Sequence, residues 1–424
     1  MPPFPPKNFI PVKSEMPGFT VYAPDPNVKQ AAIEEFKCPQ CGAMTAYSIG
    51  QAAISCQHCG FVEEIDAQVV GKEAARNDFS LDNLALAAHG WGEERKELKC
   101  LSCGAEIAIP AESLVASCAF CGSNKVVLGV ASQVQLQPKY LIPFKVDAPA
   151  SQKIARDWMG KSWMIPKKLK DYASLQPFTP IYIPYWSFHA KTNANWRAEV
   201  GHTVSERYYN SSTKSWETRT KTVWRWESGN VKLNIDNLLV PGTERISLYH
   251  LEKVASFDLN GLTSYAPGFL AGMQAKGYDR ALEPAWELAR GKMRESTKSA
   301  CYSDASSSQI RNFSMKMDFE DENWRYLLMP VYLAAYQYDL KTYQAVINGQ
   351  NGAISGQRPV DWKKVNLVIG LSFLPAIIAA IIALISYLVN GAAGSAGAFV
   401  WLLLLVAVIS AFVIYGQAKK EGKI

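Results

Sequence analysis

The segment KCPQCGAMTAYSIGQAAISCQHCG (residues 37–60) recurs with identical spacing as KCLSCGAEIAIPAESLVASCAFCG (residues 99–122). Each copy contains two C-x2-C pairs separated by fourteen residues. Two residues between cysteines allow a tight turn to direct both sulfurs at one metal ion. The intervening residues form a hairpin that brings the second turn beside the first. The two segments therefore predict two zinc ribbons.

The cysteine pairs supply four thiolates to each ion, which is the tetrahedral ligand set of a structural zinc site. A glycine follows every pair, and glycine tolerates the positive φ that lets backbone N–H groups approach the sulfurs. Such a site has no open position for water, so we expect two structural Zn2+ ions. Iron–sulfur ligation is the alternative. The predicted metal ligands are Cys38, Cys41, Cys56, Cys59, Cys100, Cys103, Cys118 and Cys121.

Other residues with catalytic chemistry are isolated in the sequence. Cys301 has no base at a motif spacing, and we interpret it as a small apolar residue. His58 lies inside a cysteine pair whose zinc shell is already complete, so we expect it to be exposed. No P-loop, G-x-S-x-G or H-E-x-x-H motif occurs. We therefore predict that the protein is not an enzyme, with no catalytic or cofactor-binding residues.

Two uncharged runs near the C-terminus predict a transmembrane hairpin, residues 361–424, with spans at 365–389 and 398–415. About 20 apolar residues are enough to cross a bilayer. A buried hairpin of a soluble protein is the alternative, but the runs have no polar face. Lysines flank both runs and none lies between them, which predicts that both termini lie in the cytosol. Thiols stay reduced there, as zinc ligation requires.

The region between the ribbons and the spans, residues 140–360, predicts a β-rich α+β cytosolic body. Residues 216–226 alternate with period two, and so do residues 196–208, with a polar turn between them. A second hairpin is predicted at 342–356, and an amphipathic helix at 281–300.

A weak internal repeat runs through this body. The segments IYIPYWSFHA (181–190) and LLMPVYLAAY (327–336) share an apolar stretch, a proline and aromatic residues, and YLIPFKV (140–146) echoes them. We interpret the body as two weakly repeated halves that flank the helix. With the ribbons and the membrane hairpin, the fold class is multi-domain α+β. The other predicted units are a Pro-rich arm (1–30), zinc ribbon 1 (31–65), a linker (66–92) and zinc ribbon 2 (93–130). The linker is predicted to be partly helical near residues 81–88.

The net charge of +6 conceals a division along the chain. Residues 1–150 have a net charge of −4, and residues 151–424 have a net charge of +10. Acidic ribbons disfavour phosphate binding, so a protein partner is the better expectation and nucleic acid is disfavoured. The basic segments 153–170 and 197–225 contain tryptophans, which suits single-stranded nucleic acid or, beside a membrane, anionic lipid headgroups. The plain alternative is a tryptophan core with a solvated basic face.

The combination of motifs resembles the bacterial zinc-ribbon membrane proteins of the YdjG-like type. The C-x2-C-G pairs occur in many protein families. The segment YQAVINGQNGAISGQRP (343–359), which precedes the spans, is more specific to this family. The resemblance implies an association with PspA-like and SPFH (flotillin-like) proteins, and a role in membrane stress response (phage shock, envelope stress) or membrane organisation. Relatives often have a primosomal-helicase label, but this sequence has no ATPase motif.

From these observations we predict a membrane-anchored cytosolic adaptor or scaffold. Its zinc ribbons would recruit PspA-like or SPFH-type proteins to the inner membrane. The alternative hypothesis is a membrane-tethered nucleic-acid-binding protein. The sequence leaves the oligomeric state and the sensed signal open.

Overall fold

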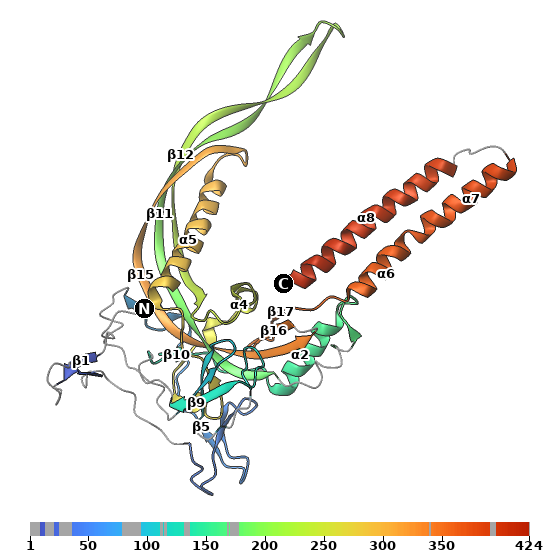
Figure 1. Cartoon of the computed structure of the whole chain (residues 1–424). Coiled ribbons are helices and arrows are strands. Elements are labelled where there is room, and N and C mark those ends of the chain that lie inside the picture. The colour runs from blue at the N-terminus through green and yellow to red at the C-terminus, as the bar shows by residue number, and fades with distance from the viewer. Residues whose placement is uncertain are drawn as a thin grey trace.

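The computed structural model describes residues 9–12, 21–24, 36–78, 95–110, 113, 117–130, 136–167, 169, 178–338, 341–390 and 396–423. A curved β-sheet forms the centre, and a pair of apolar helices extends away from its base (Figure 1). The fold class predicted from the sequence is confirmed: two ribbons, a β-rich body with helices, and a C-terminal helical pair. The predicted helix near residues 81–88 lies outside the described residues.

Three long antiparallel strands build a curved arm (Figure 1). The central strand β11 (Thr179–Asn210) pairs with β12 (Ser215–Pro241) on one side and with β15 (Ile310–Tyr338) on the other. The pairing with β15 ends at Val200, so the arm continues beyond it as a two-stranded ribbon. The predicted hairpin is thus confirmed, and its strands are much longer than the alternating segments.

The repeated segments lie side by side in this sheet. Ile183 of β11 pairs with Met329 of β15, and Tyr140 of β10 (Tyr140–Leu141) pairs with Leu327. The interpretation of two separate halves is therefore replaced by a single sheet with adjacent, similar strands. The similarity has a physical cause, because both segments are buried on both faces and such strands are continuously apolar.

Helix α5 (Leu282–Asp304) lies along the concave side of the arm (Figure 1). The predicted apolar face, from Leu282 to Met293, is buried, and the same face continues to Thr297 and Cys301. Trp286 contacts Phe188 of β11, with ring centroids 5.3 Å apart. The helix thereby covers the part of the arm that has three strands.

The tryptophan face of the predicted hairpin is not a core. Trp216 and Trp226 are 64% and 51% exposed, which excludes the plain alternative for these residues. Trp196 of β11 is buried instead, and its Nε1–H donates to Asp304 at the end of α5, 2.9 Å away. An alternating sequence shows which residues share a face of a strand. It does not show which of the two faces another element covers.

The chain ends in helices α6 (Trp362–Ser372), α7 (Leu374–Asn390) and α8 (Ala396–Lys423). Residues Trp362–Val389 and Phe399–Lys419 have mean hydropathies of 2.8 and 2.6, and only 6% of each apolar window is buried. Both segments are long and apolar enough to cross a membrane. Their exposure contradicts the alternative of a hairpin buried in a soluble protein.

Shorter elements complete the structure. The second predicted hairpin, residues 342–356, is confirmed. It consists of β16 (Lys341–Asn348) and β17 (Ile354–Gly356), which pair antiparallel. The remaining bounds are β1 (Phe9–Val12), β2 (Val21–Pro24), β3 (Ala46–Ser48), β4 (Ala53–Ser55), β5 (Val62–Glu64), η1 (Gly71–Glu73), β6 (Asn77–Asp78), β7 (Arg95–Cys100), β8 (Glu106–Pro110), β9 (Val126–Val130), α2 (Ala148–Gly160), α4 (Leu248–Val254), η2 (Leu259–Gly261), β13 (Thr263–Ser264), η3 (Pro267–Leu270) and β14 (Gln274–Ala275).

Candidate metal centres

The four cysteine pairs share one backbone geometry. The glycine after each pair donates its N–H to the carbonyl oxygen of the first cysteine, at 2.8–3.0 Å. This turn requires a positive φ, and the four glycines have φ values between 69° and 76°. They are Gly42, Gly60, Gly104 and Gly122. The spacing of the sequence motif is thereby converted into four equivalent knuckles.

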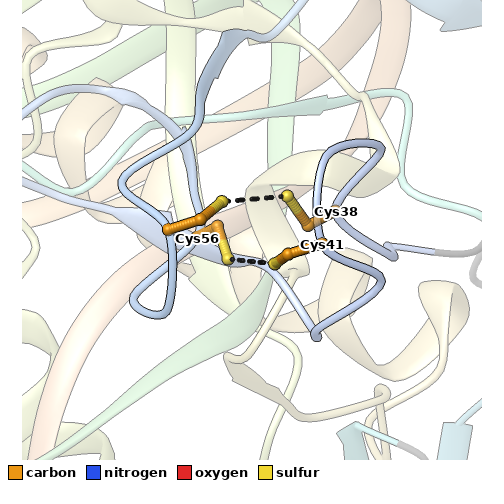
Figure 2. Close-up of side chains that lie close together, drawn as sticks. Cys38, Cys41 and Cys56 are labelled. Carbon is orange, nitrogen blue, oxygen red and sulfur yellow. Dashed lines mark hydrogen bonds between the residues drawn. The ribbon is translucent and has the colours of Figure 1, made fainter.

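In ribbon 1, the two knuckles lie at the same end of the β3–β4 hairpin, where Ala46 pairs with Ser55. The sulfurs of Cys38 and Cys59 lie 3.4 Å apart, and those of Cys41 and Cys56 lie 3.5 Å apart (Figure 2). All four sulfurs lie within 4.8 Å of one another. A tetrahedral zinc–thiolate site with Zn–S bonds near 2.3 Å places its sulfurs about 3.8 Å apart, whereas a disulfide needs about 2.0 Å. The cluster therefore fits an ion.

Ribbon 2 has the same arrangement. The sulfurs of Cys100 and Cys121 lie 3.6 Å apart, and those of Cys103 and Cys118 lie 3.8 Å apart. The N–H of Phe120 donates to the Cys118 sulfur at 3.4 Å, which is the expected approach of a backbone N–H to a ligand. The eight predicted cysteines thus form two four-cysteine groups whose geometry supports two structural zinc ions. Bound zinc would cross-link the two knuckles of each ribbon.

One thiol in each cluster is easy to ionise. Backbone N–H groups of Cys59 and His58 lower the pKa of Cys56 to about 6. Burial raises the pKa of Cys100, but backbone N–H groups of Cys103 and Ser102 outweigh it and lower the pKa to about 7. Zinc binds thiolates, so each ribbon presents a first ligand in the required state near neutral pH.

Ribbon 2 is part of the body's core. Its strands β7, β8 and β9 join the main sheet through β14, where Ala108 pairs with Ala275. Ile107 and Phe120 are fully buried in the same cluster as Ile183 of β11. Metal binding in this ribbon therefore acts directly on the packing of the body.

Two residues of the body support the cysteine group of ribbon 2. The sequence patterns do not reveal either of them. Arg245 donates from Nη1 to the carbonyl oxygen of Cys103 at 2.8 Å, and Gln344 donates from Nε2 to that of Phe120 at 2.6 Å. Each contacts one knuckle. The guanidinium also offsets part of the negative charge of a zinc–tetrathiolate centre.

A single segment of the body holds both ribbons. The carbonyl of Ala271 accepts the N–H of Tyr47 in ribbon 1 at 2.9 Å. One residue away, Leu270 accepts the buried guanidinium of Arg95 in ribbon 2 at 2.7 Å. The rings of Tyr47 and Phe269 also meet edge to face, with centroids 5.4 Å apart. The two metal centres therefore belong to one assembly.

Comparison with known proteins finds a similar protein whose own function is not characterized. The chain is 26% identical over 336 residues to the uncharacterized protein YdjG of Bacillus subtilis (strain 168). The alignment covers 78% of this chain and 92% of YdjG. No family model and no solved structure matches the chain. The similarity and the two four-cysteine groups together fit a zinc-ribbon protein, as the sequence resemblance predicted.

The other sequence candidates are not members of the four-cysteine groups. His58 is exposed, as expected, and Cys301 is fully buried in α5, where burial raises its pKa. A cavity of about 810 Å3 lies between β12, α4 and η2. Two of its charged groups, Lys292 and Glu252, form an ion pair at 2.6 Å. These features suggest no reaction class.

Proposed function

We propose that this protein is a membrane-anchored cytosolic scaffold that recruits partner proteins to a bacterial inner membrane through its zinc ribbons. The supporting observation is structural continuity. Both ribbons are seated on one body segment, Phe269–Met273, and that body leads into α6 over five residues, 357–361. Closed sites of four thiolates stiffen a surface and do not turn over a substrate.

Both ribbons present apolar side chains to solvent. Met44 and Val62 of ribbon 1 are 49% and 46% exposed, and Leu101 and Val127 of ribbon 2 are 65% and 50% exposed. The surrounding part of the chain is acidic, with a net charge of −4 over residues 1–150. This surface suits a protein partner with an apolar patch and basic rim. The resemblance to YdjG-like proteins suggests PspA-like or SPFH-type partners, in membrane stress response or membrane organisation.

The proposed orientation places both termini in the cytosol. Lys363 and Lys364 precede the first apolar run, Lys419 follows the second, and the loop between the spans has no charge. Lysines accumulate on the cytosolic side of membrane proteins. The ribbons, which belong to the same body, would then face the cytosol.

The test uses the full chain, isolated from membranes with its bound proteins. Removing ribbon 2 is unsuitable, because Phe120 is part of the core. We expect the surface variants M44S/V62S and L101S/V127S to retain zinc and to lose most of the partner. Leu288→Ser, at an exposed position of α5, should leave recovery unchanged. Equal partner recovery from the wild-type chain, the two surface variants and the control would contradict the scaffold role of the ribbons.

The nucleic-acid alternative receives less support. On the arm, the guanidinium of Arg311 lies over Trp224 at 4.2 Å, and that of Arg197 lies over Trp226 at 4.4 Å. Bases that stack on these rings would have to displace the protein's own side chains. Salt-sensitive binding of single-stranded DNA or RNA by the full chain would favour this alternative.

A further inference from the structure

A short segment of the body, residues 161–167, lies against the base of the apolar helices. Met164 of this segment is buried with Val365 of α6 and Ala418 of α8. The carbonyl of Met164 accepts the N–H of Asp361 at 2.8 Å. The carbonyl of Ile165 accepts from Nζ of Lys364 at 3.2 Å. The segment is therefore fixed where α6 begins and α8 ends, although it lies about 200 residues earlier in the chain.

The connection between body and helices is also held. Gln357 donates its N–H to the carbonyl of Gln344 at 2.9 Å. Arg358 donates to the carbonyl of Trp158 at 3.2 Å, and its guanidinium lies over the ring of Trp158 at 4.8 Å. These contacts fix residues 357 and 358, which precede α6, to β16 and α2 of the body.

Aromatic side chains surround this base. Trp163 is 46% exposed, Trp362 is 41% exposed and Tyr415 is 49% exposed. The rings of Trp362 and Tyr415 lie 5.6 Å apart. Half-exposed tryptophan and tyrosine are typical of the boundary between hydrocarbon and water, where the ring is apolar and its polar atom needs water.

Lysines accompany the aromatic residues. Among the residues that the structure describes at this level, the exposed lysines are Lys161, Lys167, Lys363 and Lys419. Among the described residues 157–167, 357–366 and 414–419, the acidic residues are Asp157 and Asp361. Asp361 caps α6 and lies 3.4 Å from Lys364. The exposed charge at the base is therefore predominantly positive.

The opposite end of the helical pair has exposed aromatic residues as well, Tyr387 (53%) and Trp401 (73%), but no lysine. Residues 390–397 (NGAAGSAG) contain neither a charged nor an aromatic residue. Aromatic residues at both ends are typical of a membrane span. The positive charge, which is found at one end alone, complements an anionic leaflet, whose surface attracts lysines within a Debye length.

We propose that residues 161–167, together with Lys363 and Lys419, form a collar that binds anionic phospholipid headgroups. The collar holds the body against the bilayer surface. This inference rests on the membrane anchoring in the proposed function and adds the lipid partner and its binding surface. Each lysine near an anionic leaflet strengthens the attraction about fivefold, so two lysines account for about 25-fold.

The experiment places the full chain in bilayers of phosphatidylcholine and phosphatidylglycerol and counts the retained lipids by native mass spectrometry. The wild-type chain should retain phosphatidylglycerol preferentially. K161Q/K167Q should reduce that retention by at least about tenfold. The matched control K232Q/K316Q removes two exposed lysines from the arm and should leave retention unchanged.

Two results would overturn the collar: a wild-type chain without preference for phosphatidylglycerol, or undiminished retention by K161Q/K167Q. Carbonate extraction of the same samples separates this failure from a failure of anchoring. All variants should stay in the membrane pellet. Release of the wild-type chain by carbonate would contradict the anchoring and the collar together.

Discussion

At the scale of single residues, the two metal centres differ in how much protein surrounds them. In ribbon 1, Cys41 and Cys59 are exposed, whereas Cys103 and Cys121 of ribbon 2 are half-buried. Among the described strands, those of ribbon 2 join the main sheet, while those of ribbon 1 form a small sheet of their own. Zinc in ribbon 1 therefore organises a separate small sheet that reaches the body's core through Tyr47, and zinc in ribbon 2 supports strands of the main sheet itself.

This difference predicts unequal effects of losing one ligand. Cys41→Ser and Cys103→Ser should each reduce zinc from two ions per chain to one, measured by elemental mass spectrometry. Cys103→Ser should also destabilise the body by about 2–5 kcal/mol, since it loosens core residues such as Phe120. Hydrogen exchange at the β7–β8 pairing, whose Leu98 and Ile107 lie in the same core cluster as Phe120, would register this change. Equal protection of that pairing in both variants would contradict the account.

Arg245 provides a second test at this scale. Arg245→Gln removes the donor to Cys103, and we expect zinc release from ribbon 2 to a chelator to accelerate by about 10–100-fold. Arg219→Gln, which changes an exposed arginine on the arm, is the control. Unchanged release kinetics in Arg245→Gln would show that the guanidinium does not support the site.

The eight ligands were predictable because a zinc knuckle is encoded within a few consecutive residues. Arg245 and Gln344 were not, since they lie 142 and 224 residues from the atoms that they contact. No spacing rule links positions so far apart. The sequence therefore located the eight cysteines that the structure brings together in two groups, while the residues that support them required the fold.

At the scale of elements, periodicity predicted α5 and the arm hairpin, but not the extent of β11. Its first part, from Ile181 to Ala190, is buried on both faces, so no alternation marks it as a strand. The position of α5 on the arm could not be predicted from the sequence either. It depends on contacts such as Trp196 with Asp304, which join distant segments.

Gly229 of β12 tests this packing. A Cβ there would lie 2.6 Å from Nε1 of Trp196 and would also overlap with Oδ2 of Asp304. Gly229→Val should therefore separate the two side chains and destabilise the end of α5 by about 1–3 kcal/mol, measured by hydrogen exchange over residues 296–304. Gly291→Ala, at a helix position with open space around it, should be neutral or stabilising. The same protection in both variants would contradict this contact.

At the scale of the whole molecule, the ribbons, the sheet and the apolar helices form one connected structure. Phe269–Met273 holds both ribbons, and residues 161–167 join the body to α6 and α8. The sequence indicated each part by its own local pattern. The contacts between the parts involve backbone carbonyl oxygens and single buried residues. Such contacts produce no periodic pattern in the sequence, so they could not be predicted from it. In the proposed scaffold, a partner bound to the ribbons would be held at a defined place above the membrane.

The most direct measurement of the proposed scaffold is the membrane-bound fraction of the co-purifying partner in cells. Cells with the full chain should retain the partner on membranes. Cells with a chain that ends at residue 361, before the candidate spans, should release both the chain and the partner into the soluble fraction. A partner whose membrane-bound fraction is the same in both strains would contradict the proposed function.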